Sequence, residues 1–100
     1  MSARGPRVRA VLEMGITRSE FVRLLPAAIG RDGAQLVDDA LSGTWDGLDW
    51  RLTIAEKPPR RIARLSVPVL EVTLDFPGAV DAQTRPFVEQ FLRAYQRAGG

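Results

Sequence analysis

Four cations lie within eight residues near the middle of the chain, and two prolines separate the first cation from the others. These cations are Lys57, Arg60, Arg61 and Arg64. Ammonium and guanidinium groups bind carboxylates and phosphates through charge-assisted hydrogen bonds, and prolines restrict the loop that presents them. We therefore predict a partner- or phosphate-binding tip. The alternative is a solvated turn whose charge and prolines protect a sheet from edge pairing. No aromatic residue accompanies the cations, so stacking on single-stranded bases is not indicated.

Two tryptophans flank an Asp-Gly pair that is typical of a hairpin turn. We expect Trp50 to face the core. We expect Trp45, next to the turn, to be the more exposed tryptophan. We count it among the candidate partner-binding residues, because an exposed tryptophan anchors partners well.

Carboxylates form a second group, made up of Asp38, Asp39, Asp46 and Asp49. Calcium and magnesium take oxygen ligands, but the spacing does not fit the regular calcium loop. We predict that Asp46 and Asp49 serve turns, and we expect neither a metal nor a cofactor.

The composition removes most familiar catalytic chemistry. The chain has no cysteine and no histidine, which excludes disulfides, thiolate zinc sites and the usual general base near neutral pH. Hydroxyl groups at Ser19, Ser42, Ser66 and Tyr95 have no evident base to activate them. The glycines match neither the dinucleotide nor the P-loop pattern. We expect a protein that is not an enzyme.

The formal net charge of +2 belongs to the leading end of the chain, where Arg4, Arg7 and Arg9 lie within nine residues. The remaining chain has 11 basic and 12 acidic residues, a net charge of −1. A short basic arm of this kind adds salt-dependent affinity for nucleic acid, and a solvated terminus is the alternative. The nearly neutral body does not by itself indicate a nucleic-acid binder.

The first half of the chain predicts a strand and then a helix. Residues 7–14 alternate between apolar and polar types, as a half-buried strand does. Thr17 and Glu20 fit a capping box, in which each side chain bonds the backbone amide of the other. We expect a kink or break at Pro26 and an end at Gly30. A short strand or helical turn around residues 35–41 then precedes the tryptophan hairpin.

The second half predicts a longer hairpin and a closing helix. A four-residue loop at 57–60 would pair Ile54 with Ala63, Leu52 with Leu65 and Trp50 with Val67, which puts all these apolar side chains on one face.

The inward pattern changes after Pro68, so we predict a bulge or bend there, and the N-terminal strand as the next neighbour. The closing helix carries an apolar stripe from Phe87 to Tyr95 and is capped by Asp81 or Thr84.

Together these patterns predict one α+β domain over residues 7–100, after a flexible tail at 1–6. Its small antiparallel sheet of three to five strands carries two helices on one face, in the order β-α-β-β-β-α. No apolar run is long enough to span a membrane, and we expect a cytoplasmic protein. We expect it to bind another protein or itself, as a homodimer. The alternatives are a nucleic-acid module that uses the basic arm and hairpin 57–64, and a small-molecule binder or enzyme without a recognisable motif.

Overall fold

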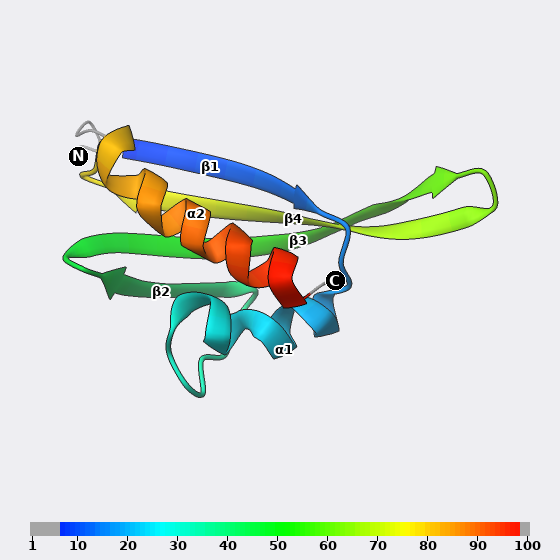
Figure 1. The fold of residues 1–100 in the computed structure, drawn as a ribbon, viewed down its shortest axis with the longest axis horizontal. Coiled ribbons are helices and arrows are strands. Elements are labelled where there is room, and N and C mark those ends of the chain that lie inside the picture. The colour runs from blue at the N-terminus through cyan, green and yellow to red at the C-terminus, as the bar shows by residue number, and fades with distance from the viewer. Residues whose placement is uncertain (1–6, 99–100) are drawn as a thin grey trace.

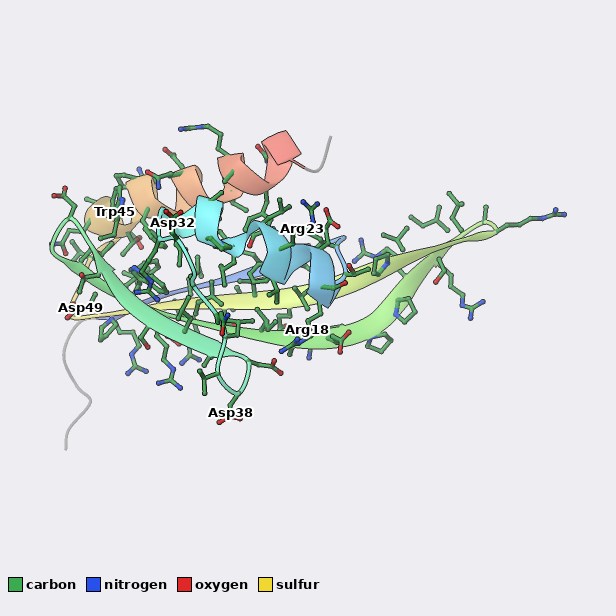
Figure 2. The ribbon with its side chains drawn as sticks, turned by 90° about the horizontal axis from the view of Figure 1, so that it is seen from below. Arg18, Arg23, Asp32, Asp38, Trp45 and Asp49 are labelled. Atoms are coloured by element: carbon green, nitrogen blue, oxygen red, sulfur yellow. The ribbon has the colours of Figure 1, made fainter. Side chains whose placement is uncertain are left out.

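A computed structural model describes residues 7–98 and shows the predicted α+β fold (Figure 1). Its elements are β1 (Arg7–Met14), α1 (Arg18–Ile29), β2 (Ala40–Trp45), β3 (Leu48–Ile62), β4 (Leu65–Pro77) and α2 (Asp81–Ala98). The four strands form one antiparallel sheet in the order β1-β4-β3-β2. Both helices cover the same face of that sheet, as the edge-on view in Figure 2 shows. The fold class, the element order and the pairing of the N-terminal strand are confirmed; the predicted tail at 1–6 lies outside the described residues.

The start of α1 follows half of the predicted capping box. The Thr17 hydroxyl accepts a hydrogen bond from the Glu20 amide at 3.2 Å. The Glu20 carboxylate does not reach back, because it binds Arg23 one turn further along the helix. Of the predicted kink or break at Pro26, the break is wrong: α1 continues to Ile29, since a proline in the last turn removes little of the remaining hydrogen bonding. Gly30 ends α1 in the left-handed conformation, as predicted.

The start of α2 corrects both predicted caps. The helix begins at Asp81, so Val80 occupies the preceding position. The Val80 carbonyl accepts hydrogen bonds from the amides of Gln83 and Thr84, while the Gln83 side chain accepts one from the Val80 amide. Valine has no side-chain acceptor, so Gln83 supplies only the reciprocal bond of a capping box, and neither Asp81 nor Thr84 is the cap.

Two short turns shape the segment before β3. Asp46 and Gly47 both have positive φ and join β2 to β3, which confirms the Asp-Gly hairpin. The region at 35–41 contains no helix; Val37 bridges Ala40 around a turn at Asp38 and Asp39. Positive φ at both turn residues is the pattern of a type I′ turn, which aspartate tolerates.

The predicted register between β3 and β4 is wrong. The chain reverses at residues 63–64 rather than at 57–60, so Leu52 pairs with Leu74 and Ile54 pairs with Val72. Both registers put apolar residues opposite one another. Only in the observed register does the apolar segment of β4 after Pro68 pair with β3 on one side and with β1 on the other. The irregularity lies between Lys57 and Arg60, across from Pro68.

The core lies between the sheet and the two helices. Its fully buried side chains are Phe21, Leu25, Leu52, Leu70, Val72, Leu74, Phe76, Phe87 and Phe91. Rings from α1, α2 and β3 join within it, with Phe87 stacked 5.6 Å from Trp50. Trp50 is buried, as expected. None of the buried residues lies between residues 55 and 69, so the distal half of the β3–β4 hairpin is outside the core.

Candidate functional site

The β3–β4 hairpin projects beyond the rest of the sheet as a two-stranded arm, which we define as residues 57–69 (Figure 1). The pairing of β1 with β4 ends at Met14 and Leu70, and the pairing of β2 with β3 reaches only Thr53. Beyond these points no other strand among residues 7–98 pairs with the hairpin, and residues 15–18 lie against its base alone. The arm helps to make the protein 47 Å long but only 28 by 26 Å across.

Prolines sit at the base of the arm. Pro58 and Pro59 form the bulge in β3, opposite Pro68 in β4. Proline has no amide donor, so it interrupts a strand edge and opposes the addition of a further strand. The arm consequently offers its faces, rather than its edges at the base, to a partner.

The four predicted cations divide into two pairs. Lys57 lies 3.9 Å from Glu71, and Arg60 lies 2.5 Å from Glu13 of β1. These two carboxylates neutralise the cations nearest the body. Arg61 and Arg64, at the tip, form no ion pair with any residue in the range 7–98. The free positive charge of the arm is therefore confined to its end.

Apolar side chains accompany the arginines at the tip. Ile62 pairs with Leu65 across the turn, and these side chains are 55% and 68% exposed. Val67 follows two residues after Leu65 and lies on the same face of the strand. Our sequence reasoning missed Ile62 and assigned Leu65 and Val67 to the core, because the wrong register put them opposite Leu52 and Trp50.

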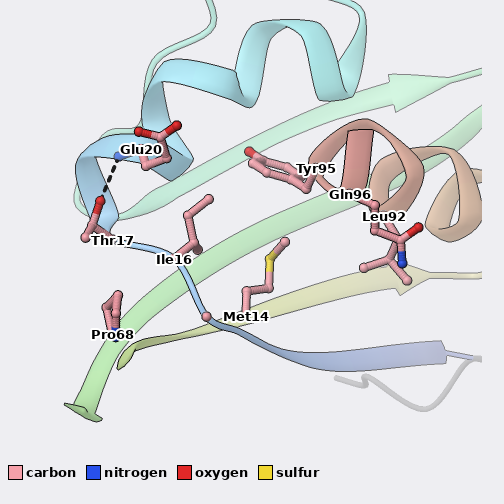
Figure 3. Close-up of a pocket in the computed structure, with 9 residues that line it drawn as sticks. Met14, Ile16, Thr17, Glu20, Pro68, Leu92, Tyr95 and Gln96 are labelled. Atoms are coloured by element: carbon pink, nitrogen blue, oxygen red, sulfur yellow. Dashed lines mark hydrogen bonds between the residues drawn. The ribbon is translucent and has the colours of Figure 1, made fainter. Parts of the chain in front are cut away.

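A groove of about 590 Å³ opens where the arm joins the body (Figure 3). Its walls come from the end of β1, the start of α1, the last turns of α2 and the base of the arm. The lining is mainly apolar, with Met14, Ile16, Pro68 and Leu92 among its residues, and Glu20 lies at its rim. A β-carbon on Gly15, which also lines the groove, would stand 3.3 Å from Val67. Val67 pairs with Arg60, which binds Glu13 on the face of the sheet away from the helices, so the apolar side chains of the arm and the groove lie on opposite faces.

A smaller hollow of about 200 Å³ adjoins this groove and shares Ile16, Thr17 and Pro68 with it. Glu56 belongs to the wall of this hollow. The Glu56 carboxylate forms no ion pair within residues 7–98, although Arg18 is near it. The hydrogen bond from Arg18 to Asp39 is the main reason that the pKa of Arg18 is raised. The base of the arm thus presents a free carboxylate beside an apolar groove.

Trp45 and Asp49 lie at the opposite end of the molecule from the arm (Figure 2). Trp45 is half-buried, with its ring edge-on to Phe87 at 5.5 Å. The structure therefore does not bring Trp45 together with the basic tip. Asp39 is engaged by Arg18, and the part of the chain that the structure describes contains no cluster of three or more potential metal-ligating side chains.

Two of the three arginines near the N-terminus belong to the sheet and not to a free N-terminal extension. Arg7 and Arg9 are residues of β1, and Arg9 binds Asp75 at 2.9 Å. Arg4 lies outside the described residues. None of the helices in residues 7–98 is long and apolar enough to cross a membrane.

Tyr95 is the most perturbed titratable group. Its hydroxyl is buried and donates a hydrogen bond to the Phe21 carbonyl at 2.9 Å, which ties α2 to α1. Burial raises the pKa of Tyr95 well above its usual value. This phenol holds its proton at neutral pH, so the interaction stabilises helix packing and leaves no activated nucleophile.

The arm and the groove are two features of residues 7–98 that the packing of the core does not explain. Comparisons with protein-family models, with curated proteins and with solved structures found no match. The chemistry of these two surfaces is what bears on function.

Proposed function

We propose that this protein is a binding module that contacts another protein through its arm. The observation that carries the proposal is the pair Ile62 and Leu65, which stand more than half exposed at the end of a hairpin that nothing in the described chain covers. An isolated two-stranded hairpin is marginally stable in water. Burying an isoleucine or leucine side chain completely stabilises a structure by about 1.5–3 kcal/mol. A partner that covers both side chains recovers a large part of that energy.

The charges of the arm favour a protein partner over a nucleic acid. A phosphate clamp needs several free cations, since its affinity scales with the number of phosphates neutralised. Glu71 and Glu13 already neutralise two of the four cations. The remaining cations, Arg61 and Arg64, are the sequence neighbours of Ile62 and Leu65 at the tip, and protein interfaces are enriched in arginine.

Site-specific photo-crosslinking tests this proposal. A photoreactive amino acid replaces Leu65 at the tip, and a matched control replaces Val37, which is 72% exposed and lies outside the arm. We expect protein adducts from position 65 in the native cells, few from position 37, and loss of the tip adducts in an Ile62→Ser background. Equal adduct yields at the two positions would contradict the proposal. Nuclease-sensitive adducts at position 65 would instead support the nucleic-acid alternative.

A further inference from the structure

β1 forms one edge of the sheet, and its outer side has no strand beside it in residues 7–98 (Figure 1). Within this range, the backbone of β1 forms hydrogen bonds only with β4. Proteins commonly protect a free strand edge with a proline or a bulge. β1 contains no proline, and it pairs with β4 over eight consecutive residues without a register shift. Its outer side is therefore suited to the addition of another strand.

The other strand edges of the described chain are better protected. β2 is only six residues long, and the guanidinium group of Arg31 donates hydrogen bonds to the Ser42 carbonyl in that strand at 3.5 Å. The edges of the arm are interrupted at its base by Pro58, Pro59 and Pro68. β1 is thus the least protected edge within residues 7–98.

The apolar row that crosses the sheet on its helix-covered face is incompletely buried at β1. The β1 members of this row pack against the core but are only half-buried: Val8, Ala10, Leu12 and Met14. Their directly paired neighbours in β4 are fully buried: Phe76, Leu74, Val72 and Leu70. On the helix-free face of β1, Val11 is 57% exposed. An added strand with the same alternation would cover apolar side chains on both faces.

We infer that this added strand is β1 of a second copy, and that the two sheets join antiparallel about a two-fold axis at Val11. Residues that lie opposite one another in an antiparallel pair share a face of the sheet. On the helix-covered face, Ala10 then lies beside Leu12 of the second copy and Val8 beside its Met14. On the helix-free face, the two copies of Val11 lie beside each other. This inference goes beyond the proposed function, because the arm takes no part in strand pairing at β1.

The charges on the helix-free face favour a second copy as the occupant. In the inferred register, Arg9 lies opposite Glu13 of the second copy, and Glu13 lies opposite its Arg9. Within each copy, Arg9 already binds Asp75 and Glu13 already binds Arg60. The row across the joined sheets is therefore Asp75, Arg9, Glu13 and Arg60, in which the signs alternate. The side chains of Arg9 and Glu13 are 55% and 58% exposed, so each has room for a second partner.

The position of the axis follows from the same pairing. An axis at Ala10 would put exposed Val11 opposite Arg9 of the second copy, which leaves an apolar side chain beside a charged one. An axis at Val11 puts apolar side chains opposite one another and each charge opposite its counterpart. The resulting contact uses the same patch on both copies and is closed.

Sedimentation velocity on the purified full chain tests self-association. A strand of eight residues is smaller than the roughly 20–30 residues a side of a standard interface, so we expect a reversible dimer. Between about 1 and about 500 μM protein, the mass is expected to rise from that of one copy, 11.0 kDa, toward twice that value.

A charge at the axis tests whether β1 forms the contact. Val11→Lys sets two like charges opposite each other and is expected to weaken association at least about tenfold. Val37→Lys, which changes an exposed valine outside β1, is expected to leave association unchanged. Circular dichroism of each variant establishes that it is folded. A dimer that is equally strong in both variants would overturn the inferred contact.

Cysteine substitution tests the register, because the chain has no cysteine of its own. Opposed residues of an antiparallel pair have α-carbons about 4.5–5.5 Å apart, within the range that a disulfide spans. Val11→Cys is therefore expected to form a covalent dimer on oxidation. Arg9→Cys is the matched control, because its two copies lie about 13 Å apart along the strands and are expected to remain unlinked. A disulfide that forms only in a mixture of the two variants would place the axis at Ala10 and overturn the register.

A chain that remains a monomer up to about 500 μM would overturn the inference of self-association. The proposed function would still stand if position 65 gave protein adducts in cells, since those adducts do not require pairing at β1. A dimer that forms as inferred but gives no such adducts would refute the proposed function alone.

Discussion

Removal of the arm is expected to leave the body folded. The change replaces residues 58–68 with Asn-Gly, a two-residue turn that joins Lys57 to Val69 without altering their pairing. In the removed segment only Val67 and Pro68 are half-buried, and every other residue is exposed. Losing these partial contacts costs about 1–2 kcal/mol on the scale of side-chain burial, and the favourable new turn offsets part of it. We therefore expect a net loss of about 1 kcal/mol in the free energy of unfolding.

Urea unfolding followed by tryptophan fluorescence measures this loss, because Trp45 and Trp50 both lie in the body. A loss of about 1 kcal/mol corresponds to a fall of roughly 4–8 °C in the melting temperature of a domain of this size. Leu52→Ala provides the comparison: this side chain is fully buried, so its truncation is expected to cost about 2–5 kcal/mol. If removing the arm cost as much as Leu52→Ala, or left the body unfolded, the arm would be part of the core and our reasoning would be refuted.

Three further substitutions test local features of the fold. Tyr95→Phe removes the hydrogen bond to the Phe21 carbonyl and should cost about 1–2 kcal/mol in urea unfolding. Burial raises the pKa of Tyr95 in the folded state, so the unfolded state loses this proton at a lower pH. The free energy of unfolding of the unmodified chain should therefore decline above about pH 10, and that of Tyr95→Phe should decline less. Gly43→Ala sets a β-carbon 2.7 Å from the Trp50 ring and should lower stability by about 1–3 kcal/mol, whereas exposed Ser42→Ala should not. Ala63→Gly relieves a positive φ of 55° at the arm's turn, so amide exchange in the arm should slow about twofold; faster exchange would contradict this account.

Local signals in the sequence were sufficient for much of the fold. Thr17 before an amphipathic segment predicted the start of α1, and Asp46-Gly47 predicted the turn between β2 and β3, because both act over a few residues. The alternation in residues 70–76 correctly predicted which side chains of β4 are buried. These features depend on neighbours in the chain and not on the final packing.

The register of the long hairpin could not be predicted in the same way. The turn at residues 63–64 contains Ala63 in a left-handed conformation, where glycine or asparagine is the usual signal. The prolines at 58–59 gave a stronger turn signal, but in the folded chain they form a bulge within a strand. Only the competition between two apolar pairings across the whole sheet decides between these alternatives.

Only part of the candidate site could be predicted, because its ion pairs and its groove also depend on residues that are distant in sequence. The sequence indicated the cations from Lys57 to Arg64, yet it did not show that Glu13 and Glu71 neutralise two of them. The groove was also missed, because its walls come from four elements that are distant in sequence and meet only in the fold. No motif within a single segment marks such a surface.

Amide hydrogen exchange tests the central claim most directly, namely that the arm stands outside the core of the domain and is free to bind a partner. The exchange of residues 60–66 would be compared with that of residues 70–76 in the same strand pair of the full chain. We predict that the arm amides exchange at least about a hundredfold faster, because every side chain at 60–66 is exposed whereas Leu70, Val72, Leu74 and Phe76 are fully buried. Equal protection of the two segments would contradict the claim.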